Sequence, residues 1–364
     1  MLDASSSVRP IDVHMTGSEW FGSRPGGLNR YFEDLFQALQ SAGANVSASA
    51  FGEAPTGGTS WGTAQGSTTS RIIRSMNGPR GRPGLVTDRH FSLYGRQPYI
   101  ARSKSSLVVH FQGPWAAESS AAGHGNFRTA IKERIEKLRY REAGAFVVLS
   151  DGFGRILVER YGIDEDKIQV IPPGVNLDKF VLRRSLPTAP NVLCVRRLER
   201  RMGIHVLLDA WPDVLRAQSE ATLTIVGTGT EEENLRRQAA ILGINSSVRF
   251  TGRVSDGELP RLYEDALCTV VPSVDLEGFG LIALESLAVG RAPIVTACGG
   301  LPDAVKGLDE TLIVSIGDSE ELSKRVIDAI AGAIPSPEDC RRHAEGFAWA
   351  NVAEKHIDLY RSLA

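Results

Sequence analysis

The chain has little of what marks a disulfide, zinc or membrane protein. Its four cysteines, at positions 194, 268, 298 and 340, are far apart and form no Cys-x-x-Cys spacing, so neither a zinc site nor a disulfide framework is predicted. No stretch approaches the roughly 18 apolar residues of a membrane helix. The amino-terminal residues also lack the basic-then-apolar pattern of a signal peptide. We therefore expect reduced thiols and a cytoplasmic protein.

Charge of one sign is not in excess either. Lysine and arginine number 41 against 43 aspartates and glutamates, so a nucleic-acid partner, which needs a basic surplus, is not expected. The chain has no HExxH, no Gly-Lys-Ser/Thr phosphate loop, no Ser-His-Asp order and no histidine or aspartate cluster at metal-ligand spacing. These absences argue against the commonest hydrolases and nucleoside triphosphatases, and no metal site is predicted.

Short β-branched runs instead alternate with amphipathic runs of helical length, which is typical of βαβ units and a parallel sheet. In the first half, strands are predicted at 11–16, 45–51, 107–111, 145–150 and 168–171, and helices at 27–41, 128–143 and 152–161. In the second half, strands are predicted at 192–196, 222–226, 248–251, 268–272, 292–296 and 312–314, with helices such as 203–216 and 231–242. We expect an α/β protein with two doubly wound sheets, in which ligands lie at the carboxyl ends of the strands.

At 364 residues, the chain is long enough for two domains. Residues 178–190 carry basic side chains and two prolines, which indicates a linker. We predict an amino-terminal domain at 1–180 and a carboxyl-terminal domain at 181–346, with a last helix at 347–364 that packs back on the first. Two stretches rich in Gly, Ser, Pro or Thr, 52–70 and 77–84, are predicted to be mobile surface loops.

The most informative stretch runs from Glu277 to Glu285 and reads Glu-Gly-Phe-Gly-Leu-Ile-Ala-Leu-Glu. A predicted strand precedes it and an apolar helix leaves it, so free N–H groups of a helix N-terminus point out of the loop toward an anion. A helix rises about 1.5 Å per residue, which allows both carboxylates to reach one pocket. The pair indicates either two catalytic carboxylates or an acidic N-cap followed by a solvated glutamate. Within an apolar helix, however, Glu285 needs a partner.

Two further patterns follow predicted strands of the second half. Arg196, Arg197, Arg200 and Arg201 can form a bidentate phosphate site, with Arg197 the best candidate, or a solvated basic turn. The second pattern, Gly227-x-Gly229, lacks the third glycine of a dinucleotide fingerprint. NAD is therefore not predicted, whereas a mononucleotide or a diphosphate stays compatible.

Two patterns stand out in the first half. Gly26-Gly27 begins a predicted helix and either exposes N–H groups to a ligand or forms a plain turn. His110 ends a predicted strand and either hydrogen-bonds a hydroxyl group or has a structural role.

Together these motifs resemble the family 4 retaining nucleotide-sugar glycosyltransferases, which have the GT-B fold. The resemblance covers nearly the whole chain and is carried by Gly26-Gly27, His110, Ile171-Pro-Pro-Gly-Val-Asn176, Arg197-Leu198 ahead of Gly203, Gly227-x-Gly229, Gly252-Arg253-Val254, and Glu277 and Glu285 as the family's Glu-x7-Glu motif. It implies two Rossmann-like domains facing a central cleft, the first binding the acceptor and the second the nucleotide sugar. The implied reaction transfers a hexose from a UDP or GDP sugar to a hydroxyl group, with neither cofactor nor metal ion.

By the same resemblance, Glu277 would bond hydroxyls of the transferred sugar, Arg197 would neutralise the diphosphate, and His110 would meet the sugar. These three are the implied catalytic residues. The implied donor-binding residues are Gly26, Gly27, Arg201, Gly227, Gly229, Arg253, Val254, Phe279, Gly280, Leu281 and Glu285, the last of which would bond the ribose.

The sequence departs from the family at two positions of the arginine cluster. Arg196 stands where the family has a glycine, and Met202 stands where it has a lysine. The second cation for the diphosphate would then be Arg200 or Arg201. A third and milder departure is Asn176 in place of the family's aspartate.

Two other functions remain as alternatives: a nucleotide-sugar epimerase of the same fold, and a nucleotide-sugar-binding protein without catalysis. The acceptor is not encoded in a readable motif, and a small molecule, a natural product, a glycan or a lipid-linked acceptor all fit. No oligomeric state is predicted. Five arginines of the first half form either a solvated face or a contact surface for an anionic acceptor or a membrane; they are Arg80, Arg82, Arg89, Arg96 and Arg102.

Overall fold

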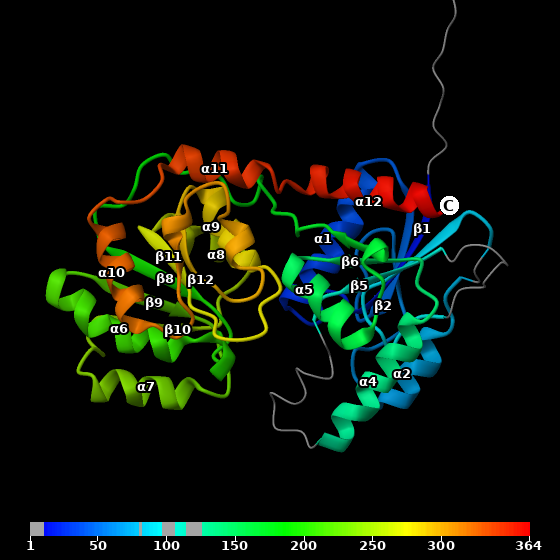
Figure 1. Ribbon diagram of the computed structural model, residues 1–364, viewed down its shortest axis with the longest axis horizontal. Helices are drawn as coiled ribbons and strands as arrows, with labels where there is room; N and C mark the ends of the chain where they lie inside the picture. Colours follow the sequence, from blue (N-terminus) through cyan, green and yellow to red (C-terminus); the bar gives the residue numbers. More distant parts are fainter. Residues whose placement is uncertain (1–10, 80–81, 97–105, 114–125) are drawn as a thin grey trace, which may run out of the picture. The chain divides into compact units, whose positions relative to one another are not determined.

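A computed structural model of the chain describes residues 11–79, 82–96, 106–113 and 126–364. The chain divides into two compact units (Figure 1). Unit 1 comprises Met1–Gly174 and Trp349–Ala364, and unit 2 comprises Val175–Ala348. Among the described residues, every helix is too short or too polar to cross a lipid bilayer.

Unit 1 is built on a seven-stranded parallel sheet with the order β3-β2-β1-β4-β5-β6-β7. Its strands are β1 (Asp12–Glu19), β2 (Asn45–Phe51), β3 (Gly58–Ser60), β4 (Leu85–Arg89), β5 (Leu107–Phe111), β6 (Ala145–Val148) and β7 (Ile168–Val170). Its helices are α1 (Gly27–Ser41), α2 (Thr68–Ser75), α4 (Asn126–Tyr140), α5 (Asp151–Ile156), which continues as a π-helical turn (Leu157–Tyr161), and α12 (Trp349–Leu363).

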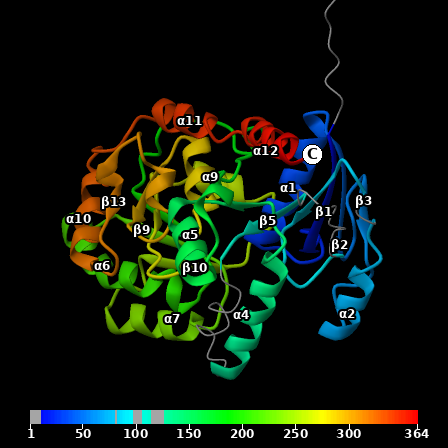
Figure 2. The same cartoon turned by 45° about the vertical axis from the view of Figure 1, so that its right-hand side comes forward.

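The last helix, α12, lies beside α1 in both views of the molecule (Figure 1, Figure 2). Val352, Ala353, Ile357 and Tyr360 of α12 are buried in one apolar cluster with the inner face of α1 and with β1. Each large apolar side chain buried in this way contributes about 1.5–3 kcal/mol. Burial of this apolar face therefore fixes the end of the chain to unit 1.

Unit 2 is built on a six-stranded parallel sheet with the order β10-β9-β8-β11-β12-β13. Its strands are β8 (Asn191–Val195), β9 (Thr222–Val226), β10 (Val248–Gly252), β11 (Cys268–Val271), β12 (Ala292–Thr296) and β13 (Ile313–Val314). Its α-helices are α6 (Ile204–Ala217), α7 (Glu232–Ile241), α8 (Leu259–Glu264), α9 (Leu281–Val289), α10 (Ser319–Ile330) and α11 (Pro337–Glu345).

The predicted α/β class with two doubly wound sheets is confirmed. The prediction of a loop throughout 52–70 is wrong, because β3 and the start of α2 lie there, and β4 was not predicted. β3 is short and polar, and α2 begins where the Ser67 side chain accepts a hydrogen bond from Ser70 N–H. β4 reads Leu-Val-Thr-Asp-Arg and is almost entirely buried. Its two charged residues break the apolar pattern by which a buried strand is predicted from sequence.

The strand order reverses once in each sheet, between β1 and β4 in unit 1 and between β8 and β11 in unit 2. At such a reversal the connections leave toward opposite sides, which opens a crevice at the carboxyl ends of the two strands. The residues that follow these strands are therefore the first place to look for a binding site.

Candidate active site

The carboxylate of Glu277 lies at the strand reversal of unit 2. Glu277 belongs to the loop between β11 and α9, and its Oε2 atom accepts hydrogen bonds from Arg196 Nη2 and, at 3.1 Å, from Ser273 Oγ. Arg196 directly follows β8, so this ion pair joins the ends of the two strands that flank the reversal. The pair is mostly buried, with 7% of the Arg196 side chain and 13% of the Glu277 side chain exposed.

The environment of Glu277 keeps it ionised. Burial opposes ionisation, but the charge and hydrogen bond of Arg196, the Ser273 hydroxyl and the charge of Arg201 outweigh it, so the pKa of Glu277 lies below its ordinary value. A carboxylate that is ionised at neutral pH accepts hydrogen bonds but cannot donate a proton. If Glu277 and Glu285 were a catalytic acid and base, one of them would have to carry a proton, and Glu277 is not suited to that role.

Close backbone contacts fix the loop that carries Glu277. The preceding residue, Leu276, is the one non-glycine with a positive φ (48°) among the described residues, and its carbonyl accepts a hydrogen bond of 2.9 Å from Arg201 Nη1. On the other side, Gly300 N–H donates to the Glu277 carbonyl at 3.1 Å. A Cβ atom at Gly299 would lie 1.9 Å from that carbonyl oxygen. Only glycine at 299 therefore allows this approach.

Helix α9 begins directly after this loop and presents an N-terminus without a side-chain cap. Gly280 is the N-cap, with φ 88°, and the first turn carries no acidic residue. A Cβ atom at this position would lie 2.3 Å from Leu301 Cδ2. Phe279 is buried and Leu281 half-buried. Free N–H groups and the helix dipole make this end of α9 suitable for a phosphate or for sugar hydroxyls.

The second carboxylate of the motif, Glu285, has the partner that its apolar helix requires. It is 5% exposed, and its Oε2 atom accepts a hydrogen bond of 2.8 Å from the hydroxyl of Tyr263 on α8. Glu285 is thus oriented from within unit 2. Its contact with a ribose stays a prediction.

The other predicted donor-binding residues of unit 2 follow β8, β9 and β10. Arg197 and Arg253 are exposed and Val254 is half-buried. Gly227 and Gly229 must be glycines for a steric reason that the sequence did not reveal. A Cβ atom at Gly227 would lie 1.9 Å from the Arg196 carbonyl oxygen, and one at Gly229 would lie 2.2 Å from the Leu198 carbonyl oxygen. The two glycines thus let the loop after β9 pack against the arginine cluster.

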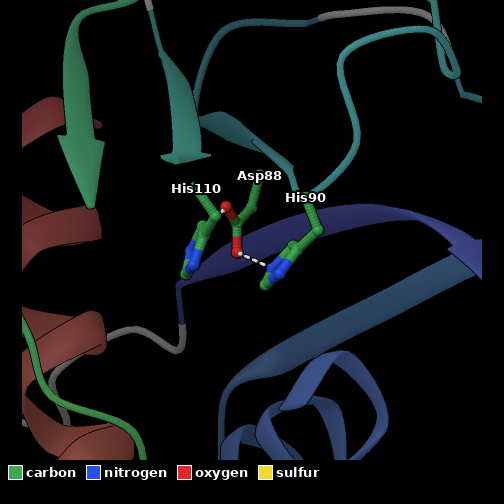
Figure 3. Close-up of side chains that lie close together, drawn as sticks. All are labelled: Asp88, His90 and His110. Carbon is green, nitrogen blue, oxygen red and sulfur yellow. Dashed lines mark hydrogen bonds and ion pairs between the residues drawn. The ribbon is translucent and has the colours of Figure 1, made fainter. Parts of the chain in front are cut away.

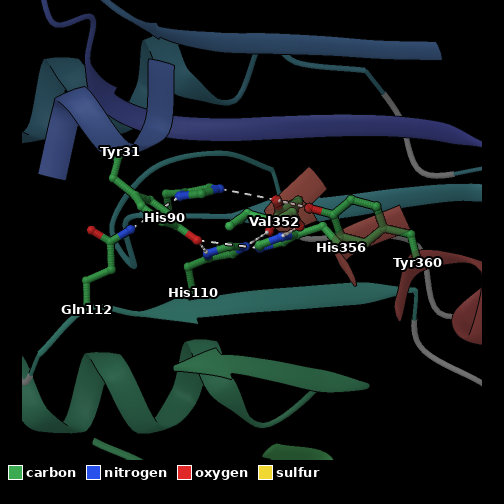
Figure 4. Close-up of polar contacts among 8 residues, drawn as sticks. Tyr31, His90, His110, Gln112, Val352, His356 and Tyr360 are labelled. Atoms are coloured by element: carbon green, nitrogen blue, oxygen red, sulfur yellow. Dashed lines mark hydrogen bonds and ion pairs between the residues drawn. The ribbon is translucent and has the colours of Figure 1, made fainter. Parts of the chain in front are cut away.

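The predicted site residues of unit 1 differ in exposure. Gly26 is the N-cap of α1 and Gly27 its first residue, both are exposed, and this helix has no side-chain cap. His110, in contrast, is buried, with 1% of its side chain exposed. Its Nε2 atom lies 3.0 Å from Asp88 Oδ1, and its Nδ1 atom lies 3.4 Å from the Tyr31 hydroxyl (Figure 3, Figure 4). In this conformation the ring faces the interior of unit 1, and its contact with a sugar stays a prediction.

Sequence reasoning missed the network around His110. The Asp88 carboxylate also contacts His90 Nε2 at 3.1 Å and accepts a hydrogen bond of 2.6 Å from the Tyr360 hydroxyl of α12. The rings of His90 and His356 stack on His110 with centroid distances of 3.8 Å and 5.3 Å (Figure 4). The only available signal was the sequence Asp-Arg-His at the end of an unrecognised strand.

Asp88, His90 and His110 have the side-chain types of a metal site, and their ligand atoms lie within 4.8 Å of one another (Figure 3). The lone pairs of an imidazole lie in the plane of its ring. Because the planes of His90 and His110 are stacked 19° from parallel, these lone pairs do not converge well on one point. The arrangement is better suited to hydrogen bonding with Asp88 than to metal binding.

The buried histidines predict that acid destabilises unit 1. Burial lowers the pKa of His14 and of His90 to about 4 and that of His356 to about 3, with the charge of His110 adding to the effect on the last two. Between about pH 6.5 and 4 the unfolded chain therefore binds more protons than the folded one. We expect the free energy of unfolding to fall as the pH drops through this window, by about 1.4 kcal/mol per pH unit for each histidine.

The measurement is hydrogen exchange of α1 and α12 peptides at several pH values, after correction for intrinsic exchange rates. Their protection should fall more steeply between pH 6.5 and 4.5 than the protection of β9 in unit 2. Equal slopes for the two units would show that these histidines are not buried in the neutral state.

A separate surface hollow in unit 2, of about 900 Å³, shares no residue with this site. Asp309, Asp328 and Asp339 line it beside Arg325 and Arg342. The three aspartates exceed the two arginines by only one charge, so the lining does not strongly favour one class of ligand.

Two family descriptions together match most of the chain. Residues 25–179 match Glycosyltransferase Family 4, and residues 182–347 match Glycosyl transferases group 1. The chain is 31% identical over 306 residues to the D-inositol 3-phosphate glycosyltransferase of Corynebacterium jeikeium, covering 75% of this chain and 71% of the relative. The protein of the same name from Nocardia farcinica is 30% identical over 320 residues, covering 80% of this chain and 69% of the relative.

Solved structures show the same fold. The Anabaena protein Alr3699/HepE, in complex with UDP and glucose, has a TM-score of 0.74 at 16% identity over 97% of this chain and 100% of that one. Sucrose-phosphate synthase of Thermosynechococcus elongatus has a TM-score of 0.75 at 21% identity over 97% and 99% of the two chains.

Proposed function

The chain belongs to the family 4 and group 1 glycosyltransferases, and we propose that it transfers a hexose from a nucleoside-diphosphate sugar to a hydroxyl acceptor, with retention of configuration and without a metal ion. The observation that carries this proposal is the ionised Glu277 beside the uncapped N-terminus of α9 and the exposed Arg197. A carboxylate that can accept hydrogen bonds from sugar hydroxyls and groups that can donate hydrogen bonds to a phosphate thus lie along one edge of one sheet.

In the proposed reaction, the bond between the anomeric carbon and the β-phosphate oxygen breaks, and the diphosphate leaves with the electron pair. The acceptor oxygen bonds to the anomeric carbon, and its proton passes to the departing phosphate or to solvent. The transition state resembles an oxocarbenium ion. Arg197 and the N–H groups of Gly280 and Leu281 would stabilise the charge that develops on the leaving group. Glu277 would hold the sugar through its hydroxyls.

The relatives guide the choice of the first substrates. A UDP-sugar is the first donor to test, because the Anabaena structure contains UDP and glucose. D-inositol 3-phosphate is the first acceptor to test, because the curated relatives carry its name.

We also propose a cytoplasmic location, since all four cysteines are free and buried. Of the five arginines that suggested an anionic or membrane surface, Arg89 is buried, Arg82 pairs with Asp12 and Arg96 is exposed, while Arg80 and Arg102 lie outside the described residues. A contact surface formed by these arginines stays a prediction.

Thermal unfolding in EDTA with UDP-, GDP- and ADP-sugars tests donor binding. At least one donor should raise the melting temperature, because a ligand present at 100 times its Kd adds about 2.7 kcal/mol to the free energy of unfolding. Free hexose and hexose 1-phosphate serve as controls and should have little effect. A panel in which no donor stabilises the protein, or stabilises it only with added Mg²⁺, would contradict the proposal. Diphosphate release that depends on an acceptor then separates a transferase from an epimerase and from a binding protein.

A further inference from the structure

We propose that Arg196 is a positioning residue of the donor-sugar site: its guanidinium holds Glu277 in one orientation, so that the second carboxylate oxygen is free to accept a sugar hydroxyl. The inference rests on the proposed function and adds a residue that the family pattern does not supply, because a glycine is usual at this position. From the sequence, Arg196 was one of four arginines of a predicted phosphate site and a departure from that pattern, and its pairing with Glu277 was not foreseen.

The two carboxylate oxygens of Glu277 differ in their hydrogen bonds. Oε2 accepts from both Arg196 Nη2 and Ser273 Oγ, and Arg196 Nη2 also donates to Ser273 Oγ. Ser273 is itself held by Thr296, whose Oγ1 donates to the Ser273 carbonyl at 2.6 Å. Among the described residues, Oε1 has no hydrogen-bond partner. The ends of β8, β11 and β12 are thereby tied together around one oxygen, and the other oxygen remains for a ligand.

The neighbouring arginines have different environments, which separates their roles. Arg197 and Arg200 are exposed, as a residue that receives a diphosphate from solvent must be. Arg201 donates to the Leu276 carbonyl and so holds the loop. Arg196 turns inward, with 7% of its side chain exposed. Its charge is directed at a carboxylate of the protein, which distinguishes it from a phosphate ligand.

Removing the guanidinium would change the electrostatics of Glu277 in a predictable direction. The charged and titratable groups around Glu277 are Arg196 after β8, Arg201 before α6, and the Cys298 thiol after β12, whose pKa is raised to about 11 by burial and by the charge of Glu277. Without Arg196, burial opposes ionisation, and only the Ser273 hydrogen bond and the charge of Arg201 still favour it. The pKa of Glu277 should therefore rise, and its orientation should loosen.

The test compares Arg196→Met, which removes the charge and keeps much of the length, with Arg196→Lys, which keeps a charge. Calorimetry measures the Kd of the stabilising nucleotide sugar and of the matching nucleoside diphosphate without sugar, from pH 5 to 8. Arg196→Met should weaken binding of the nucleotide sugar at least tenfold at pH 6 and change that of the diphosphate less than twofold. Arg196→Lys should recover part of the loss, and Arg236→Met on the exposed face of α7 should bind both ligands as the wild type does.

A second readout needs no ligand. In protein labelled with ¹³C at the glutamate side-chain carboxyl, the Glu277 resonance, assigned by its absence in Glu277→Gln, should titrate at least one pH unit higher in Arg196→Met than in the wild type. An unchanged titration would overturn the inference. An equal loss of affinity for the diphosphate would overturn it too, because Arg196 would then bind phosphate directly. If the wild type binds no nucleotide sugar, the proposed function fails, and the carboxyl titration still decides whether Arg196 controls Glu277.

Discussion

Glu277→Ala is expected to lower the kcat/KM of transfer by about 10²- to 10³-fold. In the proposed site, the substitution would remove the hydrogen bonds from sugar hydroxyls to the ionised carboxylate, each worth about 1.5–3 kcal/mol, and every 1.4 kcal/mol is a factor of about ten in rate. It also leaves the mostly buried guanidinium of Arg196 without its counter-ion. The measurement is the initial rate of nucleoside diphosphate release in the presence of acceptor, at donor concentrations below KM.

Two variants accompany this measurement. Glu277→Gln keeps the shape of the side chain and loses the charge, so it should retain more activity than Glu277→Ala. Glu320→Ala removes a glutamate from an exposed ion pair with Lys324 on α10 of the same unit and should act as the wild type does. Transfer by Glu277→Ala at the wild-type rate would remove Glu277 from the site.

Asp88→Ala is expected to destabilise unit 1 by about 3–5 kcal/mol, because each buried donor that loses its acceptor costs about 1–3 kcal/mol. Asp88 is fully buried, and its carboxylate contacts His90, His110 and Tyr360. Burial opposes its ionisation, but the charges and hydrogen bonds of His110 and His90 hold the pKa of Asp88 well below its ordinary value. Its loss leaves the three partners without an acceptor and detaches Tyr360 of α12 from β4. Urea unfolding at pH 7.5 measures the effect.

Because the chain has two units, the transition of unit 1 must be observed separately, by hydrogen exchange of α1 and α12 peptides in the same urea series. Asp12→Ala is the matched control on the same sheet. Asp12 lies at the start of β1 and pairs with the exposed Arg82, so its loss should cost about 0–1 kcal/mol. Equal costs for the two aspartates would mean that the Asp88 network is not a determinant of stability.

The sequence was sufficient to predict helices and strands wherever the local apolar pattern agrees with the burial of the side chains. Helix α1 and strands β2, β5, β9 and β12 have the predicted ends, because apolar side chains recur along them with the period of their structure. The position of Glu277 at the end of a strand and before a helix followed from the same pattern. The partner required by Glu285 was also foreseeable, although its identity, Tyr263, was not.

What the sequence could not supply are contacts between segments distant along the chain. Arg196 and Glu277 are 81 residues apart in the sequence, and they can pair only because β8 and β11 are neighbours in the sheet. The network of Asp88 depends on β4, whose Asp and Arg side chains read as a polar loop although both are buried. In both cases a charged side chain is buried because a partner from another element compensates it, and no local periodicity encodes that partner.

The stereochemistry of transfer tests the central claim most directly. The protein is incubated in EDTA with the α-linked nucleotide sugar that stabilises it and with D-inositol 3-phosphate, or with water where that acceptor is not used, and the first product is observed by ¹H NMR. A product whose anomeric coupling is that of an α-linkage, or α-hexose as the first species released, is the predicted result. A β-configured product, or a donor that remains intact with every acceptor and with water, would contradict a retaining glycosyltransferase built around Glu277.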